Sequence, residues 1–273
     1  MRRIAIALMC IILAAGTAIS QLVCEEKSED TFTEFTVNGV TFKMILVEGG
    51  NYKMGSTETG DKLLPVGPIV FIINEKDIYE RPAHDVVVSS FYIGQTEVTQ
   101  ELWEAVMGKN PSYNKGAKKP VDQVSWNDCQ KFIKKLNKLT GKNFRLPTEE
   151  EWEYAARGGK KNQGYQYAGS NNADDVAWCQ LNSNYYNENR PDFGTHPVAT
   201  KLANELGIYD MSGNVSEWCQ NKWYKYDGSK CNTSYRVYRG GSFAVIDEAC
   251  RVWDRPYSST RYRAVSIGLR LAL

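Results

Sequence analysis

Residues 145–159 read Arg-Leu-Pro-Thr-Glu-Glu-Glu-Trp-Glu-Tyr-Ala-Ala-Arg-Gly-Gly. Thr148 followed three residues later by Glu151 is a capping box, in which each side chain accepts a hydrogen bond from the other residue's backbone N–H. The two glycines at the end can adopt the left-handed backbone conformation that terminates many helices. The stretch therefore predicts a short helix over residues 152–157.

Short β-rich runs and few helices surround this stretch. An Asn-Gly pair inside residues 36–47 is typical of a tight hairpin turn, and residues 85–93, which are rich in Val, Phe and Tyr, predict another strand. Two more helices are expected, one over residues 99–107 and one from Ser125 to near Gly141. The second has an apolar face that consists of Cys129, Phe132, Ile133 and Leu136.

Composition and charge exclude several classes of protein. The 273-residue chain is 42% hydrophobic and 24% charged, which is ordinary for a globular protein. Its 33 basic and 32 acidic residues give a net charge of +1, so no strong field would attract nucleic acid, and we expect no nucleic-acid partner. The two histidines, His84 and His196, are far apart in sequence, which argues against a multi-histidine metal site.

The N-terminus has the features of an export signal over residues 1–24. Arg2 and Arg3 precede an apolar run that is too short to span a membrane comfortably. Two endings are open, namely cleavage before Gln21 and lipidation of Cys24, and the lipoprotein ending is preferred. Residues 25–39 would then be a polar tether and the start of the first hairpin. We expect an exported lipoprotein of the outer membrane or cell surface, with a secreted or periplasmic protein as the alternative.

The cysteines indicate neither a zinc site nor a complete disulfide framework. Without Cys10 in the leader and Cys24 as the anchor, five of the seven cysteines remain, and none has Cys-x-x-Cys spacing. Cys219 and Cys231 bracket a turn-rich insert and could close it as a disulfide. The alternative for each cysteine is inert burial.

Five motifs follow one another along the chain. They are Phe91-Tyr-Ile-Gly-Gln-Thr-Glu97-Val-Thr, Lys119-Pro-Val through Val124-Ser-Trp126, the stretch quoted above, Gly207-Ile-Tyr-Asp210-Met-Ser-Gly213-Asn-Val-Ser-Glu217-Trp218, and Arg239-Gly-Gly-Ser-Phe243 with a terminal Gly268-Leu-Arg270. Together they resemble the formylglycine-generating-enzyme, or sulfatase-modifying-factor, domain family over residues 40–273. The resemblance implies a single α+β domain with that family's C-type-lectin-like fold, low in regular secondary structure, with its N- and C-terminal strands close together. Fold alone does not settle function.

The resemblance also implies that catalysis is lost. Enzymes of the family oxidise a substrate cysteine to formylglycine with two cysteines that bind copper(I), for which paired thiolates are suitable ligands. Those two positions fall on Val245 and Cys250 in this chain. Because valine offers no thiolate, we expect no copper site and no enzyme activity, and we expect Cys250 to be a small buried residue.

Calcium is the metal that the resemblance still implies. The calcium loop of the family is matched by Asp210 and Glu217 as side-chain ligands and by Gly213 and Val215 as backbone ligands. Carboxylate and carbonyl oxygens are hard ligands that suit Ca²⁺ in a structural role. The alternative is a solvated acidic turn without metal. A second family calcium site would lie within residues 182–193, where the match is too loose to assign ligands.

The C-terminal segment, residues 237–273, keeps a frame of Arg-Gly-Gly-Ser, Cys-Arg and Gly-Leu-Arg around small, apolar, acidic and aromatic residues without strand or helix period. This pattern resembles the variable region of proteins diversified by retroelements, such as the spirochaete-type variable lipoproteins, in which adenine-directed mutagenesis scatters residues at Asn codons. Scattered AAC codons can encode Ala, Val, Ile, Asp, Tyr and Ser, but neither Trp253 nor Glu248. The alternative is an ordinary degenerate loop at a lost active site.

We therefore expect a surface-displayed, variable, ligand-binding protein without catalytic activity. Its partner would be a protein or surface ligand in the environment or on a host cell, bound by aromatic and Arg side chains on a rigid scaffold. The scattered side chains are expected to share one exposed patch beside Tyr238. The expected binding face consists of Tyr238, Phe243, Ala244, Val245, Ile246, Asp247, Trp253, Asp254, Tyr257, Ser258, Thr260 and Tyr262. A divergent formylglycine-generating-type oxidase and a structural envelope lipoprotein are the alternatives.

Overall fold

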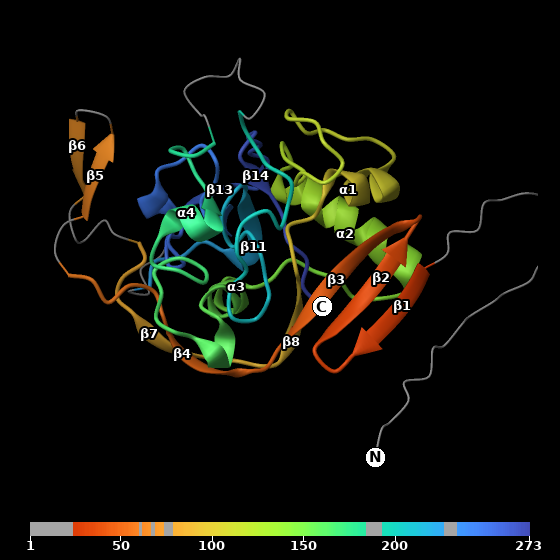
Figure 1. Ribbon diagram of the computed structural model, residues 1–273, viewed down its shortest axis with the longest axis horizontal. Helices are drawn as coiled ribbons and strands as arrows, with labels where there is room; N and C mark the ends of the chain where they lie inside the picture. The colour runs from red at the N-terminus through yellow and green to blue at the C-terminus, as the bar shows by residue number, and fades with distance from the viewer. Residues whose placement is uncertain (1–23, 60–61, 67–68, 74–78, 184–192, 227–233) are drawn as a thin grey trace, which may run out of the picture.

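The computed structural model describes residues 24–59, 62–66, 69–73, 79–183, 193–226 and 234–273. The predicted leader up to residue 23 and Cys231, the expected disulfide partner of Cys219, lie outside these ranges. The described chain combines several small sheets with few helices, which confirms the α+β prediction (Figure 1). No described helix has the length and apolar character needed to cross a membrane.

Four antiparallel strands build the N-terminal sheet in the order β1 (Cys24–Glu29), β2 (Phe32–Val37), β3 (Val40–Val47) and β8 (Phe91–Gly94). The predicted Asn-Gly turn joins β2 to β3, and both turn residues have positive φ, as a tight hairpin turn requires. The first residues of the expected tether, 25–29, do not form a free linker. They belong to β1, which pairs with β2 along its whole length.

A second four-stranded sheet is built from the C-terminal half of the chain. Its order is β13 (Tyr257–Ser259), β12 (Tyr235–Arg239), β11 (Ser216–Lys222) and β14 (Ile267–Gly268), with β14 parallel to β11 and the other pairs antiparallel. The strand β13 therefore lies at an edge, and it contains part of the predicted binding face.

The remaining described strands form three two-stranded ladders. They pair β4 (Gly50–Met54) with β7 (His84–Val88), β5 (Lys62–Val66) with β6 (Ile69–Ile73), and β9 (Ala177–Trp178) with β10 (Ser212–Gly213). The single strand predicted over residues 85–93 is wrong. The run breaks at Ser89 and Ser90, so that β7 pairs with β4 while β8 joins the N-terminal sheet.

The helices include the three that the sequence predicts and one further short helix. They are α1 (Gln100–Met107), α2 (Trp126–Thr140), α3 (Glu149–Ala156) and α4 (Ala173–Val176), with 3-10 turns at Gly159–Lys161 and Asp247–Cys250. Both predicted capping boxes form, at Ser125 and at Thr148. The helix α3 starts at Glu149 rather than at residue 152, because the three acidic residues after the cap already form its first turn.

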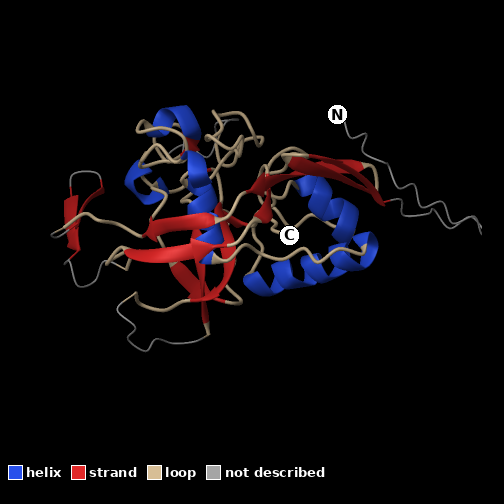
Figure 2. Ribbon diagram, turned by 90° about the horizontal axis from the view of Figure 1, so that it is seen from below, coloured by secondary structure: helices blue, strands red, loops and turns tan. Residues whose placement is uncertain are grey.

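Two large apolar clusters form the core. The first lies between the N-terminal sheet and the pair α1 and α2, which pack on one face of that sheet (Figure 2). The second surrounds α3 and the C-terminal sheet and contains Trp152 and Val237. The chain end returns to the start of the fold, since the backbones of Tyr92 and Leu273 exchange hydrogen bonds of 3.0 and 2.9 Å. This confirms the expected proximity of the terminal strands.

A buried ion pair fixes this return of the chain. The guanidinium of Arg270 is fully buried and donates to both carboxylate oxygens of Glu217 at 2.6–3.0 Å. It also donates to the carbonyl oxygens of Gly94, 2.9 Å away, and Tyr209, 2.8 Å away. One side chain thus connects β8, β11 and the chain end.

We predict that Arg270→Leu lowers the free energy of unfolding by about 3–5 kcal/mol, because it leaves Glu217 charged and buried without its partner. Urea unfolding measures the loss. The matched control is Arg263→Leu, which breaks a half-exposed pair with Asp128 and is expected to cost at most about 1 kcal/mol. Equal losses in the two variants would contradict this assignment.

Candidate ligand-binding surface

The C-terminal segment turns sharply after β12, at Gly240 and Gly241. Both have positive φ, 94° and 69°, which favours glycine. A Cβ at Gly241 would lie 2.6 Å from Cys250 Sγ and 2.6 Å from the carbonyl oxygen of Ala249, so no side chain fits there. The Gly-Gly motif therefore lets the chain pass directly over the turn at Asp247–Cys250.

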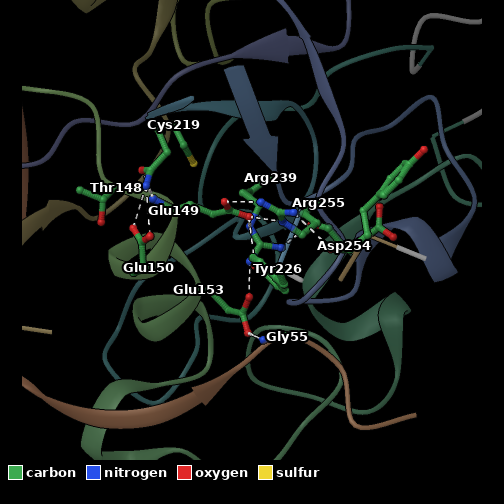
Figure 3. A network of polar contacts seen from close by, with 12 residues as sticks. Gly55, Thr148, Glu149, Glu150, Glu153, Cys219, Tyr226, Arg239, Asp254 and Arg255 are labelled. Atoms are coloured by element: carbon green, nitrogen blue, oxygen red, sulfur yellow. Dashed lines mark hydrogen bonds and ion pairs between the residues drawn. The ribbon is translucent and has the colours of Figure 1, made fainter. Parts of the chain in front are cut away.

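Two buried arginines attach this segment to α3 (Figure 3). The Arg239 guanidinium donates to Glu153, and its Nε lies 3.5 Å from Glu149 Oε1. Arg255 binds both oxygens of Glu149, at 2.7 and 2.8 Å. The side chains of Arg239, Arg255, Glu149 and Glu153 are fully buried. Two carboxylates from one helix face thus neutralise two guanidinium groups from the C-terminal segment.

Further hydrogen bonds support this network. Glu153 Oε1 accepts from the backbone N–H of Gly55 and from Arg157 Nε, both at 2.8 Å. The hydroxyl of Tyr226 donates to Glu149. Burial alone would raise the pKa of Glu149, but the hydrogen bonds and charge of Arg255, together with the charge of Arg239, hold that pKa below its ordinary value. Glu149 is therefore a permanent anion at neutral pH.

The structure gives Arg255 a framework role that the sequence did not reveal. It lies inside the segment of scattered residues, and its residue type is one of those favoured in binding surfaces. The whole residue is nevertheless only 2% exposed. Besides Glu149 it binds the carbonyl oxygens of Tyr79 and Tyr224, at 3.1 and 2.8 Å. It therefore belongs to the scaffold rather than to a ligand surface.

Part of the predicted binding face gathers around β12 and β13. The Tyr238 ring packs edge-on against Trp218, with centroids 5.4 Å apart. Burial, with smaller effects of Tyr262 and Asp254, raises the pKa of Tyr238 to about 12, so its phenol stays neutral. Tyr262 is 44% exposed. The half-buried members of this group are Tyr238, Asp254, Tyr257, Ser258 and Thr260.

An aromatic cluster that sequence reasoning missed adjoins this group. The Tyr257 ring lies 4.0 Å from that of Trp223, 5.4 Å from that of Tyr235 and 5.8 Å from that of Tyr79. Trp223 lies in the turn-rich insert between Cys219 and Cys231. The run Trp-Tyr-Lys-Tyr that starts there is the signal that could have identified it. Trp223 is buried, whereas Tyr79, Tyr235 and Tyr257 are half-buried, and half-buried rings offer large apolar area at low entropic cost.

A second group of predicted residues lies against a different part of the scaffold. Ala244, Val245, Ile246 and Asp247 are half-buried, and the Val245 carbonyl oxygen accepts from the backbone N–H of Gln180 at 2.8 Å. Burial, followed by the smaller effect of the Asp247 charge, raises the pKa of Tyr167 to about 12. Trp253 is also half-buried, and the Arg157 guanidinium lies 5.4 Å from its ring centroid.

The prediction that Phe243 belongs to the binding face is wrong. The side chain of Phe243 is 2% exposed, and its ring packs edge-on against Phe193 with centroids 5.9 Å apart. Phe243 comes two residues after the double-glycine turn, and its carbonyl oxygen accepts from the hydroxyl of Ser183. Phe243 is therefore a packing residue, and no ligand reaches it in this arrangement.

The four predicted calcium ligands do not fit a common cation. The carboxylate oxygens of Glu217 already accept hydrogen bonds from the Arg270 guanidinium and from the Trp152 indole, whose Nε1 donates at 2.6 Å. Asp210 accepts from the backbone N–H of Ala199, and burial raises its pKa to about 6. Val215 and Gly213 are buried, and the N–H of Val215 donates to Glu97. Within the described ranges, no three or more His, Cys, Asp or Glu residues form a group that could hold a metal ion. Residues 184–192 of the second calcium region lie outside those ranges.

The family's copper positions do not fit copper either. Cys250 is fully buried, and burial raises the pKa of its thiol well above the ordinary value. At the other position, Val245 has no donor atom and packs with its side chain against the cluster that contains Cys250. The two-thiolate arrangement of the family is therefore missing at these positions.

Comparison with known proteins identifies the family. A model of the sulfatase-modifying factor enzyme 1-like domain matches residues 30–273. The chain belongs to this family. The chain is 35% identical over 248 residues to the chaperone protein LppX of Paenibacillus barcinonensis, covering 75% of this chain and 79% of that protein. It is 28% identical over 254 residues to the inactive C-alpha-formylglycine-generating enzyme 2 of Bos taurus, covering 78% of this chain and 79% of that protein.

Among solved structures, the chain is similar to Treponema denticola variable protein 1. The TM-score is 0.71 and the sequence identity 30%, and the match covers 88% of this chain and 97% of that chain. This similarity confirms the C-type-lectin-like fold of the formylglycine-generating-enzyme type and the resemblance to a spirochaete variable protein.

We predict that Glu149→Gln lowers the free energy of unfolding by about 3–5 kcal/mol, because Arg255 loses its bidentate anion while it remains buried. The matched control is Glu150→Gln on the same helix turn. Glu150 is partly exposed, and its oxygens accept only from Asn221 and Tyr224 among the described residues, so the expected loss is about 1 kcal/mol or less. Urea unfolding of both variants is the measurement. Comparable losses would refute the network's role.

We also predict that Glu217→Gln lowers the melting temperature by the same amount in excess calcium and in chelator, because the carboxylate binds Arg270 and not a cation. Differential scanning calorimetry in the two buffers measures this. A stabilisation of the wild type by calcium that disappears in the variant would restore the calcium assignment.

Proposed function

We propose that the protein is a non-catalytic, ligand-binding protein whose C-terminal surface is diversified by a retroelement. One observation carries the proposal. Three arginines of the C-terminal segment are completely buried in ion pairs with the scaffold, while most of the intervening predicted residues are half-buried or exposed. A segment held in this way can change its outer side chains without losing its backbone path. The similarity to a variable protein along nearly its full length supports this proposal.

The chemistry of the surface favours a large partner. Tyr238, Tyr257 and Tyr262 contribute rigid aromatic area with polar hydroxyls, which suits recognition of proteins and of surface ligands. Ser258 and Thr260 add small hydroxyl groups beside them. We infer a protein or surface ligand in the environment or on a host cell. The near-neutral net charge gives no support for nucleic acid as the partner.

The absence of catalysis rests on two arguments from this chain. Valine at position 245 removes one of the two thiolates on which the family's copper chemistry depends. The match to an inactive formylglycine-generating enzyme is compatible with a protein that keeps the fold and loses the reaction. The alternative of a divergent oxidase would need another pair of ligands.

Display outside the cell is part of the proposal and rests on the sequence. The basic and apolar leader and Cys24 support export with a lipid anchor at that cysteine. Cys24 begins β1 and is partly buried beside the first core cluster, so an anchored protein would stand close to the membrane, with little slack between lipid and sheet. Outer membrane or cell surface is the proposed location, and secretion or the periplasm is the alternative.

A chaperone is the second candidate, since the LppX match is 35% identical across three quarters of the chain. A chaperone with a fixed client needs a constant surface, whereas a diversified binder does not. A structural envelope lipoprotein would also keep its C-terminal sequence. The variability of the encoding gene therefore separates the proposed function from these alternatives.

We predict that amplicon sequencing of the gene across a population shows substitutions concentrated in codons 244–247 and 257–262, at adenines of an adjacent template repeat. The codons for Arg239, Arg255 and Arg270 stay constant, because each arginine is buried in an ion pair. Codons 125–222 are the internal control and should show only background substitution. Equal substitution rates in both regions, or no template repeat and reverse-transcriptase gene nearby, would contradict diversification.

We further predict no conversion of cysteine to formylglycine when the purified protein is incubated with copper, oxygen and a Cys-x-Pro-x-Arg peptide. Mass spectrometry of the peptide measures the reaction, and a metal-free incubation is the control. Conversion above that control would establish the oxidase alternative.

A further inference from the structure

Cys179 and Cys250 lie in a third apolar cluster, apart from the two that form the main core. The buried members of this cluster are Tyr167, Ala173, Val176, Ala177, Cys179 and Cys250, and Val245 packs against it. The two cysteines are 1% and 0% exposed. Cys129 and Cys219 belong to the first and second clusters, so each is separated from this pair by its own packing.

The backbones that carry the two thiols are attached to the same short ladder. Cys179 directly follows β9, and Ala177 of that strand pairs with Ser212 of β10. The hydroxyl of Ser212 donates to the carbonyl oxygen of Cys250 at 2.8 Å. Cys179 and Cys250 are thereby attached to neighbouring strands of one ladder, the first by directly following β9 and the second through the Ser212 side chain of β10.

Two further hydrogen bonds bring the flanking residues together. The backbone N–H of Gln180 donates to the Val245 carbonyl oxygen at 2.8 Å. The hydroxyl of Ser183 lies 2.6 Å from the carbonyl oxygen of Cys179 and 2.8 Å from that of Phe243. The segments 179–183 and 243–250 therefore run against each other. A Cys179 thiolate would raise the pKa of Cys250, after the larger effect of burial, as expected for two nearby thiols.

We propose that Cys179 and Cys250 form a disulfide when the protein folds in an oxidising compartment. The oxidant is a disulfide of the glutathione class. In two exchange steps its S–S bond breaks and the Cys179–Cys250 S–S bond forms, so that the protein loses two hydrogens and two glutathione thiols are released. The bond closes the chain from 179 to 250 and fixes the start of the binding segment at Ala244–Asp247. This inference is independent of the proposed binding function.

Burial determines when the bond forms and how it responds to reductant. Both thiols have pKa values above the ordinary range because they are buried, so neither supplies much thiolate in the folded protein. Oxidation therefore takes place during folding, while both cysteines are accessible. Once folded, the disulfide is shielded from reductants that attack exposed bonds.

The test refolds the full chain from denaturant with reduced and oxidised glutathione, followed by alkylation and non-reducing peptide mapping. The expected result is one linked peptide pair that contains Cys179 and Cys250, with the mass of two hydrogens lost. The oxidised protein should melt about 5–10 °C above its fully reduced form. Reductant added under native conditions should leave the disulfide intact, and reductant added together with denaturant should reduce it.

Variants keep the proposal falsifiable. Cys179→Ala and Cys250→Ala should each abolish the redox-dependent shift in melting temperature, while Cys129→Ala, which removes another buried thiol, should retain it. Alanine leaves no polar group in the apolar cluster, so both variants are expected to fold. Free thiols at both positions after oxidative refolding, or a dominant link from either cysteine to a different partner, would overturn the proposal.

Discussion

The structure depends on the burial of opposite charges between α3 and the C-terminal segment. Removing two carboxylates and two guanidinium groups from water is costly, and only near-complete pairing offsets that cost. Glu149 and Glu153 achieve this pairing by lying one helix turn apart on the same face of α3, where Arg239 and Arg255 approach from the other side. The arrangement gives one backbone conformation of the C-terminal segment a much lower free energy than slightly shifted conformations, because a small shift would leave a buried charge unpaired.

The same principle operates again at the chain end. Arg270 pairs with Glu217 and also donates to the carbonyl oxygens of Gly94, at the end of β8, and of Tyr209. The C-terminal segment is therefore fixed at three points, Arg239, Arg255 and Arg270. Between these points the backbone is held while the side chains at Ser258, Thr260 and Tyr262 contribute little to the core. Stability and recognition are thereby assigned to different residues of one segment, which is the physical condition for a surface that can vary.

Features that depend on local sequence could be predicted. The Asn-Gly hairpin, the capping boxes at Ser125 and Thr148 and the helix over residues 99–107 follow from side chains that bond within a few residues of themselves. The family motifs predicted the fold as a whole, because they occur in order along the chain.

Features that depend on residues distant in sequence could not be predicted. Nothing near residues 85–93 shows that its two halves pair with different sheets. Glu217 has the residue type and spacing of a calcium ligand, and only its contact with Arg270 excludes that role. Arg255 looks like a surface arginine until Glu149, 106 residues away, is placed beside it. In each case the deciding interaction is long-range.

The central claim is that the C-terminal segment consists of fixed arginines and replaceable surface residues. A saturation library at Ala244, Ile246, Asp247, Ser258, Thr260 and Tyr262, displayed and sorted for protease resistance, tests it directly against parallel libraries at the three arginines. The account predicts that most variants at the six surface positions stay folded, also when several are combined, whereas the arginine positions accept almost nothing but arginine. Similar tolerance in the two sets of positions would contradict it.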